Sequence, residues 1–274
     1  MTLTEFALDY AMRAGAGTGY VEQLRVFTKR LNWTPANLTV SEIDAYLTQA
    51  LHSLAPQTVQ NHRRMLITLR KAALSDGLLV DQCTRPIRRV KAPLPLPRAW
   101  SHEEIGRLMA VAKKMRGGTK RCKWCVLLPA WIAVAYSSGL RLGDMLAVRH
   151  DALRGNRLAL VLAKTRRPHV VAIDDQAVAA IRSLPVHGPR IFGDLVGRCV
   201  VIRAFRRLVK ESGLQGSGKF LRRSSATYAE LAGMSATGHL GHATAGLAQR
   251  HYVDPVLLAE LKKPVPSLGL DHAQ

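Results

Sequence analysis

A proline-rich segment in the first half of the chain sets the strongest limit on its fold. Residues 85–98 read RPIRRVKAPLPLPR, so neither a helix nor a central strand can run through them. This composition favours an extended spacer between two folded units. The sequence therefore predicts an N-terminal domain over residues 1–92, a linker over residues 93–100 and a larger domain over residues 101–274.

The N-terminal region has the periodicity of helices separated by short breaks. Residues 4–13, 20–31 and 58–75 repeat apolar positions with helical spacing. A further helix is expected around Ser41, whose hydroxyl would cap its first turn. Gly77 marks the end of the last helix. We therefore predict a four-helix N-terminal domain.

The larger domain is predicted to be mostly helical, with one small β-hairpin. A capping box that begins at Ser101 opens its first helix. Residues 157–163 and 169–173 are short β-prone runs, and the turn at residues 164–168 joins them. Helical patterns resume after the hairpin. The expected fold class is therefore mainly α.

The positive charge of the chain indicates what it binds. The chain has 40 Lys and Arg residues against 19 Asp and Glu, which gives a formal net charge of +21. Such an excess favours a polyanionic partner, because each neutralised phosphate of a nucleic acid releases condensed counterions. On charge alone, a basic protein of another kind, such as a ribosome-associated factor, is the alternative.

Two basic clusters are candidates for contact with phosphate. One lies on the helix at residues 58–75, opposite its apolar positions, and the other begins the proline-rich segment. Charged helix residues are usually only solvated, but the charge of the whole chain favours a role in binding. The predicted contacts are Arg63, Arg64, Arg70, Lys71, Arg88, Arg89 and Lys91.

Other functional classes find little support. Residues 126–135 form the longest strongly apolar run, far short of the roughly 20 residues that a membrane span needs. The first residues lack the basic start and apolar core of a signal peptide. Cys122 and Cys125 have metal-ligand spacing, but no second pair completes a zinc site, and a helix start is the simpler interpretation. We expect an intracellular, cytoplasmic protein without metal or cofactor.

Four stretches, far apart in the sequence, combine residue types suited to phosphoryl transfer. A tyrosine hydroxyl, with an unperturbed pKa of about 10, is a poor nucleophile until cations surround it. Guanidinium groups match the oxygens of a phosphodiester and keep their charge at any working pH. The stretches are residues 137–144 with Arg141, the turn residue Lys164, residues 219–227 with Lys219 and Arg222, and residues 240–252 with His242 and Tyr252.

In these residues the chain resembles the tyrosine recombinases, also called the phage integrase family. The family signature has a G-L-R-x-x-E/D segment, a hairpin lysine, an H/K-x-L-R segment, an L-G-H/W segment and a tyrosine about nine residues later. One motif would be weak support, but five in the right order are specific. The resemblance covers the whole chain, and it implies a SAM-like core DNA-binding domain followed by a catalytic domain.

The resemblance also implies a role for each residue. Arg141 and Arg222 would hold the nonbridging phosphate oxygens and stabilise the transition state. Lys164 would be the general acid that protonates the departing 5′ oxygen, unless it is an ordinary turn lysine. His242 would hydrogen-bond a phosphate oxygen. Tyr252 would attack the phosphorus and form a 3′-phosphotyrosine.

Some assignments compete with nearby residues. Arg223 follows Arg222 directly, and the leucine before Arg222 favours the first arginine. His239 lies three residues before His242, and the Leu-Gly prefix favours His242. Asp144 either orients an arginine or serves as an acid at a helix N-terminus, and both roles can hold together.

Two features depart from the family pattern. Lys219 stands where His is more common, and a lysine of normal pKa is a poor base for the tyrosine proton. The interval from His242 to Tyr252 is ten residues, one more than usual, which a loop absorbs. Beside the hairpin lysine, Arg166 and Arg167 would be further contacts to the DNA backbone.

The function implied by the resemblance is site-specific DNA recombination, in integration, excision or resolution. The partner would be double-stranded DNA, and the chain would act as a homotetramer on paired sites. Residues 255–261 would dock into a neighbouring protomer or fold back on their own domain. A type IB topoisomerase, which Lys219 also fits, and a DNA-binding architectural protein that no longer cuts are the alternatives.

Overall fold

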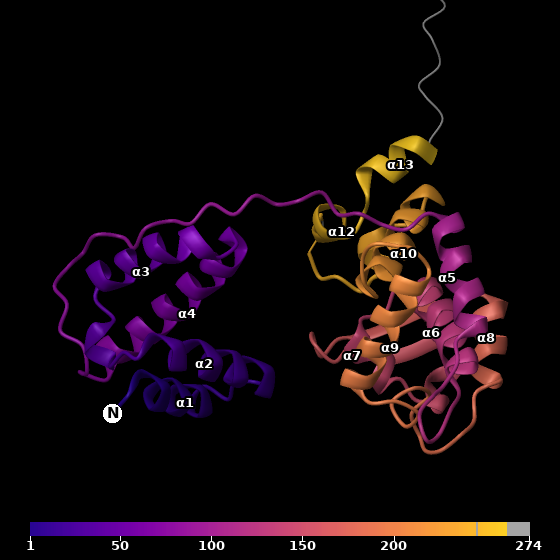
Figure 1. The fold of residues 1–274 in the computed structure, drawn as a ribbon, viewed down its shortest axis with the longest axis horizontal. Helices are drawn as coiled ribbons and strands as arrows, with labels where there is room; N and C mark the ends of the chain where they lie inside the picture. The colour runs from indigo at the N-terminus through magenta and orange to yellow at the C-terminus, as the bar shows by residue number, and fades with distance from the viewer. Residues whose placement is uncertain (245, 262–274) are drawn as a thin grey trace, which may run out of the picture. The chain divides into compact units, whose positions relative to one another are not determined.

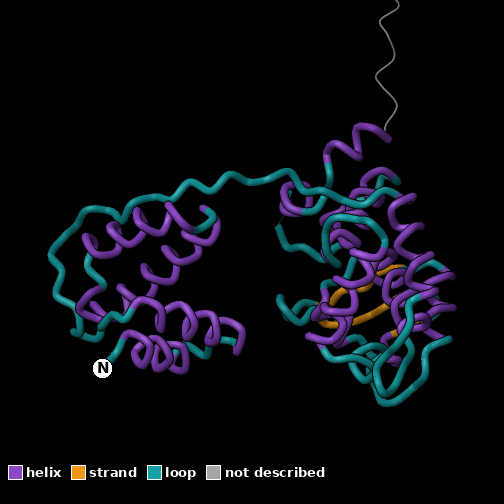
Figure 2. Tube along the Cα trace, in the orientation of Figure 1, coloured by secondary structure: helices purple, strands orange, loops and turns teal. Residues whose placement is uncertain are grey.

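The computed structural model describes residues 1–244 and 246–261, which form two compact units (Figure 1). The first unit is Met1–Pro95 and the second begins at Leu96. Helices dominate both units, and the one sheet among the described residues lies in the second (Figure 2). The predicted fold class is thereby confirmed. Residues 262–274, which we included in the catalytic domain, lie outside the described residues.

The first unit, every residue of which is described, has helices as its only regular secondary structure. The apolar faces of its helices meet in one core, where Phe6, Leu47 and Leu66 are fully buried. Its elements are α1 (Leu3–Arg13), α2 (Thr18–Leu31), the 3-10 helix η1 (Pro35–Asn37), α3 (Val40–Ser53) and α4 (Pro56–Ser75). The four predicted helices are all present.

The start of α3 differs from the prediction. We expected Ser41 to cap this helix, but the hydroxyl of Thr39 accepts from the Glu42 amide at 3.2 Å and Ser41 lies inside the first turn. The physical reason is the burial of Val40, which is 2% exposed and must already be helical to face the core. The pattern of hydroxyl residues alone does not distinguish the two starts.

The described part of the second unit packs around one apolar helix. That helix, α6, contacts α5, α8 and α10, and it is buried on most of its faces because its side chains are apolar all round. The helices are α5 (His102–Lys114), α6 (Trp124–Ser138), α7 (Leu142–Ala147), η2 (His150–Ala152), α8 (Asp175–Arg182), α9 (Arg198–Glu211), α10 (Lys219–Leu231), α11 (Ala236–His239), α12 (Leu247–His251) and α13 (Pro255–Leu261).

A three-stranded antiparallel sheet completes this unit. Strands β1 (Leu153–Arg154), β2 (Arg157–Val161) and β3 (Pro168–Ala172) pair in sequence order. The β2–β3 pair is the predicted hairpin, although β2 ends two residues before its β-prone run does and β3 is shifted by one residue. Lys164 lies in the turn between them.

The chain enters the second unit through a buried tryptophan. Trp100 is fully buried beside Phe205 and Phe220, and its indole nitrogen donates to the Gln215 carbonyl at 2.9 Å. The predicted capping box at Ser101 follows directly and is confirmed. None of the helices in the described residues combines the length and the apolar character needed to cross a bilayer.

Candidate active site

Arg222 is the centre of the cluster that the sequence predicts. It lies in the first turn of α10 and is only 5% exposed. Its guanidinium donates to the carbonyls of Gly139 and Leu240, the latter at 3.1 Å, and it contacts Nε2 of His242 at 2.9 Å. Gly139 ends α6 and Leu240 ends α11, so one side chain joins three helices.

The two glycines of the signature segments are required by close packing. Gly139 has a φ of +60°, and a Cβ there would come within 2.6 Å of the Leu240 side chain. Gly241 has a φ of +63°, and a Cβ there would come within 2.9 Å of the His169 ring. Because L side chains rarely adopt such φ values, any other residue would be strained at both positions. These glycines thus let the segments before Arg141 and His242 approach Arg222.

Tyr252 lies directly after α12, with its ring against this cluster. The Cζ atom of Arg222 is 4.9 Å from the centre of the tyrosine ring, and the His242 ring centre is 5.1 Å away. Burial alone would raise the pKa of Tyr252, but the charges of Arg222 and Arg141 outweigh burial and lower it. The environment therefore stabilises the phenolate of Tyr252 more than water does.

His242 is held in its neutral form. Burial, followed by the charges of Arg222 and Arg141, lowers the pKa of His242 to about 4. Arg222 has only donors, so Nε2 of His242 accepts from it and the proton of the neutral ring is on Nδ1. Nδ1 is buried and has no partner among the described residues, which leaves one N–H donor for a ligand.

Asp144 supports the hairpin. It is 1% exposed, and its Oδ1 accepts from the Ala163 amide at 2.7 Å, immediately before Lys164. Arg141 is the N-cap residue of α7. Within the described residues, no acidic side chain forms an ion pair with Arg141 or Arg222. The contact of Asp144 that the structure describes is therefore with the hairpin.

Unpaired buried polar atoms concentrate at this cluster. A buried polar atom without a partner is unfavourable, so such atoms are rare and mark places where a ligand or water belongs. The described residues contain seven such side-chain atoms, and five of them belong to Arg141 (Nη1), Asp144 (Oδ2), His169 (Nε2), Arg222 (Nε) and His242 (Nδ1). The arginine nitrogens are donors, as a site for an anionic oxygen requires.

The two predicted catalytic lysines are exposed. Lys164 lies in the hairpin turn, and its charge contributes to the low pKa of His242. Lys219 is the first residue of α10, one helical turn before Arg222. No hydrogen bond or ion pair of the described residues joins it to Tyr252. The structure thus brings Arg141, Arg222, His242 and Tyr252 together and leaves Lys219 at the surface.

The competing residues have other contacts. Arg223 reaches the Arg98 carbonyl at 3.3 Å and stacks over Phe220. His239 contacts the hydroxyl of Ser225 at 2.7 Å through its Nε2. These contacts tie Arg223 and His239 to the surrounding fold.

His169 is a neighbour of the cluster that the sequence reasoning missed. Burial, followed by the charge of Arg222, lowers its pKa. The position of His169 on β3 could have indicated that it faces the cluster. It pairs with Leu160 while Val171 pairs with the buried Leu158, so the alternation of the strand places His169 on the inner face.

Some of the predicted phosphate contacts are engaged within the first unit. Arg63 donates to the Arg88 carbonyl at 2.6 Å. Arg70 pairs with Asp81 at 3.1 Å, and their side chains are only 15% and 10% exposed. Arg88 donates to the hydroxyl of Thr48 at 2.8 Å.

The remaining predicted contacts are exposed and form no ion pair with a described residue. The hairpin residue Arg166 has a φ of +56°, so its turn is tightly bent. These exposed residues are Arg64, Lys71, Arg89, Lys91, Arg166 and Arg167.

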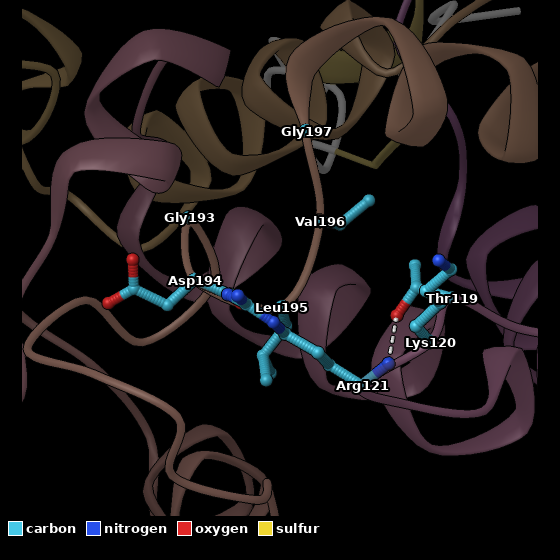
Figure 3. A pocket seen from close by; sticks show the side chains of 8 residues that line it. All are labelled: Thr119, Lys120, Arg121, Gly193, Asp194, Leu195, Val196 and Gly197. Atoms are coloured by element: carbon cyan, nitrogen blue, oxygen red, sulfur yellow. Dashed lines mark hydrogen bonds between the residues drawn. The ribbon is translucent and has the colours of Figure 1, made fainter.

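A small cavity of about 230 Å³ lies apart from this cluster in the second unit (Figure 3). Its wall includes Lys120, Arg121 and Asp194, and the Arg121 amide donates to the Thr119 hydroxyl at 3.1 Å. It includes none of the predicted site residues.

Curated relatives of the chain are tyrosine recombinases. The chain is 27% identical over 192 residues to the tyrosine recombinase XerD of Caulobacter vibrioides, an alignment that covers 68% of this chain and 61% of that protein. It is 22% identical over 179 residues to the tyrosine recombinase XerC of Chlamydia caviae, with 60% and 55% covered. The chain therefore spans less than two thirds of the length of these relatives. No protein-family model matches.

Solved structures share the fold. A lambda integrase dimer bound to a COC′ core site has a TM-score of 0.73 at 17% identity, with 98% of this chain and 81% of that chain covered. The Tn1549 transposon integrase in complex with circular intermediate DNA has a TM-score of 0.67 at 12% identity, with 97% of each chain covered. With the signature residues gathered at one place, the sequence similarities support the tyrosine recombinase family, and the solved structures share its fold.

Proposed function

We propose that this chain is a site-specific DNA recombinase that cleaves and rejoins strands through a 3′-phosphotyrosine on Tyr252. One observation carries the proposal. The Arg222 guanidinium lies over the Tyr252 ring, 4.9 Å from its centre, and has no acidic partner among the described residues. A cation beside a phenol, with its Nε donor still free, fits a phosphodiester under attack by that phenol.

The chemistry follows from the arrangement of the donors. The free nitrogens of Arg141 and Arg222 bind the nonbridging oxygens, and Nδ1–H of His242 donates to one of them. Their attraction grows as charge accumulates on these oxygens, so it acts more on the transition state than on the ground state.

In the cleavage step, Tyr252 loses its proton to water and its oxygen forms a bond to phosphorus. The bond from phosphorus to the 5′ oxygen breaks, and Lys164 protonates that oxygen. The lowered pKa of Tyr252 eases loss of its proton, so an exposed lysine at position 219 need not be the base. Attack by a 5′ hydroxyl reverses the step and restores the DNA without an external energy source.

We assign the first domain, residues 1–92, to core DNA binding and residues 101–274 to catalysis. Exposed Arg64, Lys71, Arg89 and Lys91 are the proposed phosphate contacts of the first domain. Arg166 and Arg167 add contacts from the catalytic hairpin.

The proposed assembly is a homotetramer on double-stranded DNA. A lambda integrase tetramer bound to a Holliday junction shares the fold, with a TM-score of 0.70 at 17% identity. Helix α13 contacts α10 of its own chain and leaves Val256 and Leu261 exposed. We propose that these apolar side chains dock into a neighbouring protomer.

Trapping the covalent intermediate tests the proposal. Target sites are first selected from a random DNA pool, and a nicked duplex is then offered so that the cleaved end diffuses away. The protein should acquire a DNA adduct, and Tyr252→Phe should acquire none while still binding DNA. A wild-type protein that binds but never forms the adduct would be an architectural factor.

Exchange between two cognate sites distinguishes recombination from topoisomerase activity. A recombinase should yield recombinant products that join the flanks of the two sites. Relaxation of supercoils without exchange of flanks would instead favour the type IB topoisomerase alternative.

A further inference from the structure

Asp254, two residues after Tyr252, is a buried carboxylate to which the signature assigns no role. It is 6% exposed, and both of its oxygens are used. Its Oδ1 accepts from the amides of Val256 at 3.0 Å and Leu257 at 3.2 Å, which caps α13. Its Oδ2 accepts from the amide of Ala99 at 2.7 Å, a residue that lies 155 positions earlier in the chain.

The contact with Ala99 is more than a helix cap requires. One side-chain oxygen satisfies the free amides of a first turn, and Ser, Thr or Asn serve nearly as well as Asp. A carboxylate that is almost fully buried is unfavourable unless hydrogen bonds compensate its desolvation. Here the second oxygen of Asp254 finds its partner at the point where the chain enters the second unit.

That entry point is itself fixed to the helix that carries Arg222. The Trp100 amide donates to the hydroxyl of Ser224 at 2.8 Å, and the same hydroxyl donates to the Trp100 carbonyl at 2.8 Å. Ser224 lies two residues after Arg222 on α10. Asp254 is also tied to α10 directly, because its amide donates to the Thr227 hydroxyl at 2.9 Å.

These contacts form a continuous connection. It runs from the Arg222 helix, through Ser224 and Trp100, to the Ala99 amide and on to Asp254, two residues beyond the tyrosine. A second path returns through Thr227. The segment of Tyr252 is therefore held at two points against the element that positions the arginine.

We propose that Asp254 is a positioning residue for the nucleophile, which holds Tyr252 against Arg222 by binding the Ala99 amide. The inference rests on the proposed function of Tyr252. Without this bond the segment after Tyr252 gains freedom, and the phenol spends less time in line with the phosphate. A shift on the order of 1 Å costs about 100-fold in rate when reacting groups must be aligned.

Two substitutions separate the contact with Ala99 from the helix cap. Asp254→Ser keeps a capping hydroxyl but is too short to reach Ala99 as well. Asp254→Asn keeps the size of the side chain and one oxygen that can cap the helix. Its NH₂ group then faces the Ala99 N–H, and because both are donors they cannot form the hydrogen bond. Asp174→Ser is the matched control, because Asp174 caps α8 through the Ala177 amide at 2.7 Å and is exposed.

The measurement is the rate of adduct formation on nicked target DNA at saturating concentration, beside the Kd for the same DNA. We expect both Asp254 variants to form the adduct at least about tenfold more slowly, with the Kd changed by less than about twofold. The control should keep both values. Hydrogen exchange should be faster at the Ala99 amide in both variants.

Ala99→Pro removes the donor while Asp254 and the cap remain, so it should reproduce the slow cleavage even if an Asp254 variant unfolds. Wild-type rates in Asp254→Asn and Ala99→Pro would overturn the inference, as would a loss of DNA binding equal to the loss of rate. A wild-type protein that forms no adduct would instead refute the proposed function itself.

Discussion

In the first unit, Arg70 pairs with Asp81 at 3.1 Å and Arg85 pairs with Asp44, whereas in the second unit Arg141 and Arg222 have no acidic partner among the described residues. All four belong to a chain with a large excess of positive charge. The paired arginines hold the segment after α4 on the helices of its own unit. The other two keep at least one buried donor each, Nη1 of Arg141 and Nε of Arg222, free for an anion from outside.

Leaving a buried arginine without an acidic partner costs free energy of folding. Arg222 is 5% exposed, and its Nε has no partner in the described residues. A buried cation without a counter-ion destabilises a fold, so the apolar core around α6 must offset it. Unpaired buried cations therefore indicate function better than the number of basic residues does.

Arg222→Lys should give the largest effect, a loss of cleavage rate, because it changes one of the two arginines that have no acidic partner. A lysine keeps the charge but loses the fork that reaches Gly139, Leu240 and the phosphate together. We expect cleavage of nicked DNA to slow by about 100-fold to 1,000-fold. A rate within threefold of wild type in single-turnover assays would contradict the assigned role.

Arg70→Ala tests the paired side. It leaves the mostly buried Asp81 without its cation, and we expect a loss of about 1–2 kcal/mol in the free energy of unfolding. Urea denaturation measures this loss, and the cleavage rate at saturating DNA should not change. A variant of wild-type stability that binds DNA weakly would assign Arg70 to the DNA interface instead.

The salt dependence of DNA binding sharpens the comparison within the first unit. Exposed Arg64 and Lys71 are predicted to touch phosphate, so the double alanine variant should lower the slope of log K against log salt by about 2. Fluorescence anisotropy across a salt series gives this slope. Arg70→Ala should leave the slope unchanged. Equal slopes for the wild type, the double variant and Arg70→Ala would contradict the proposed contacts of Arg64 and Lys71 with phosphate.

Near neutral pH His242 should give the smallest effect, because its contribution to stability appears only as the pH falls. Its pKa is lowered to about 4 in the folded chain, while an unfolded histidine titrates near 6.5. The unfolded state therefore binds an extra proton between these values, so stability is lost as the pH falls from about 6.5 through about 4. In His242→Gln the free energy of unfolding should fall less steeply with decreasing pH, as measured by urea denaturation at several pH values. The same pH dependence in the variant and in the wild type would refute this prediction.

The sequence predicted those features that depend on neighbouring residues. The Gly-Leu prefix of Arg141 and the Leu-Gly prefix of His242 are needed because Gly139 and Gly241 adopt positive φ values in tight packing. The capping box at Ser101 is likewise a local pattern and was predicted correctly.

Features set by distant parts of the chain escaped prediction. The cap of α3 depends on the burial of Val40, and the fate of Arg70 depends on where Asp81 returns to the helices. The bond between Asp254 and Ala99 spans 155 positions, and no local pattern indicates it.

A tyrosine titration tests most directly whether unpaired cations prepare the Tyr252 hydroxyl. The ultraviolet absorbance of the wild-type protein minus that of Tyr252→Phe isolates this one phenol as the pH rises. The account predicts a midpoint below the ordinary value of about 10, because Arg222 and Arg141 lower the pKa of Tyr252. It also predicts titration before Tyr136 and Tyr228, whose pKa values burial raises. A midpoint at or above 10 would contradict the account.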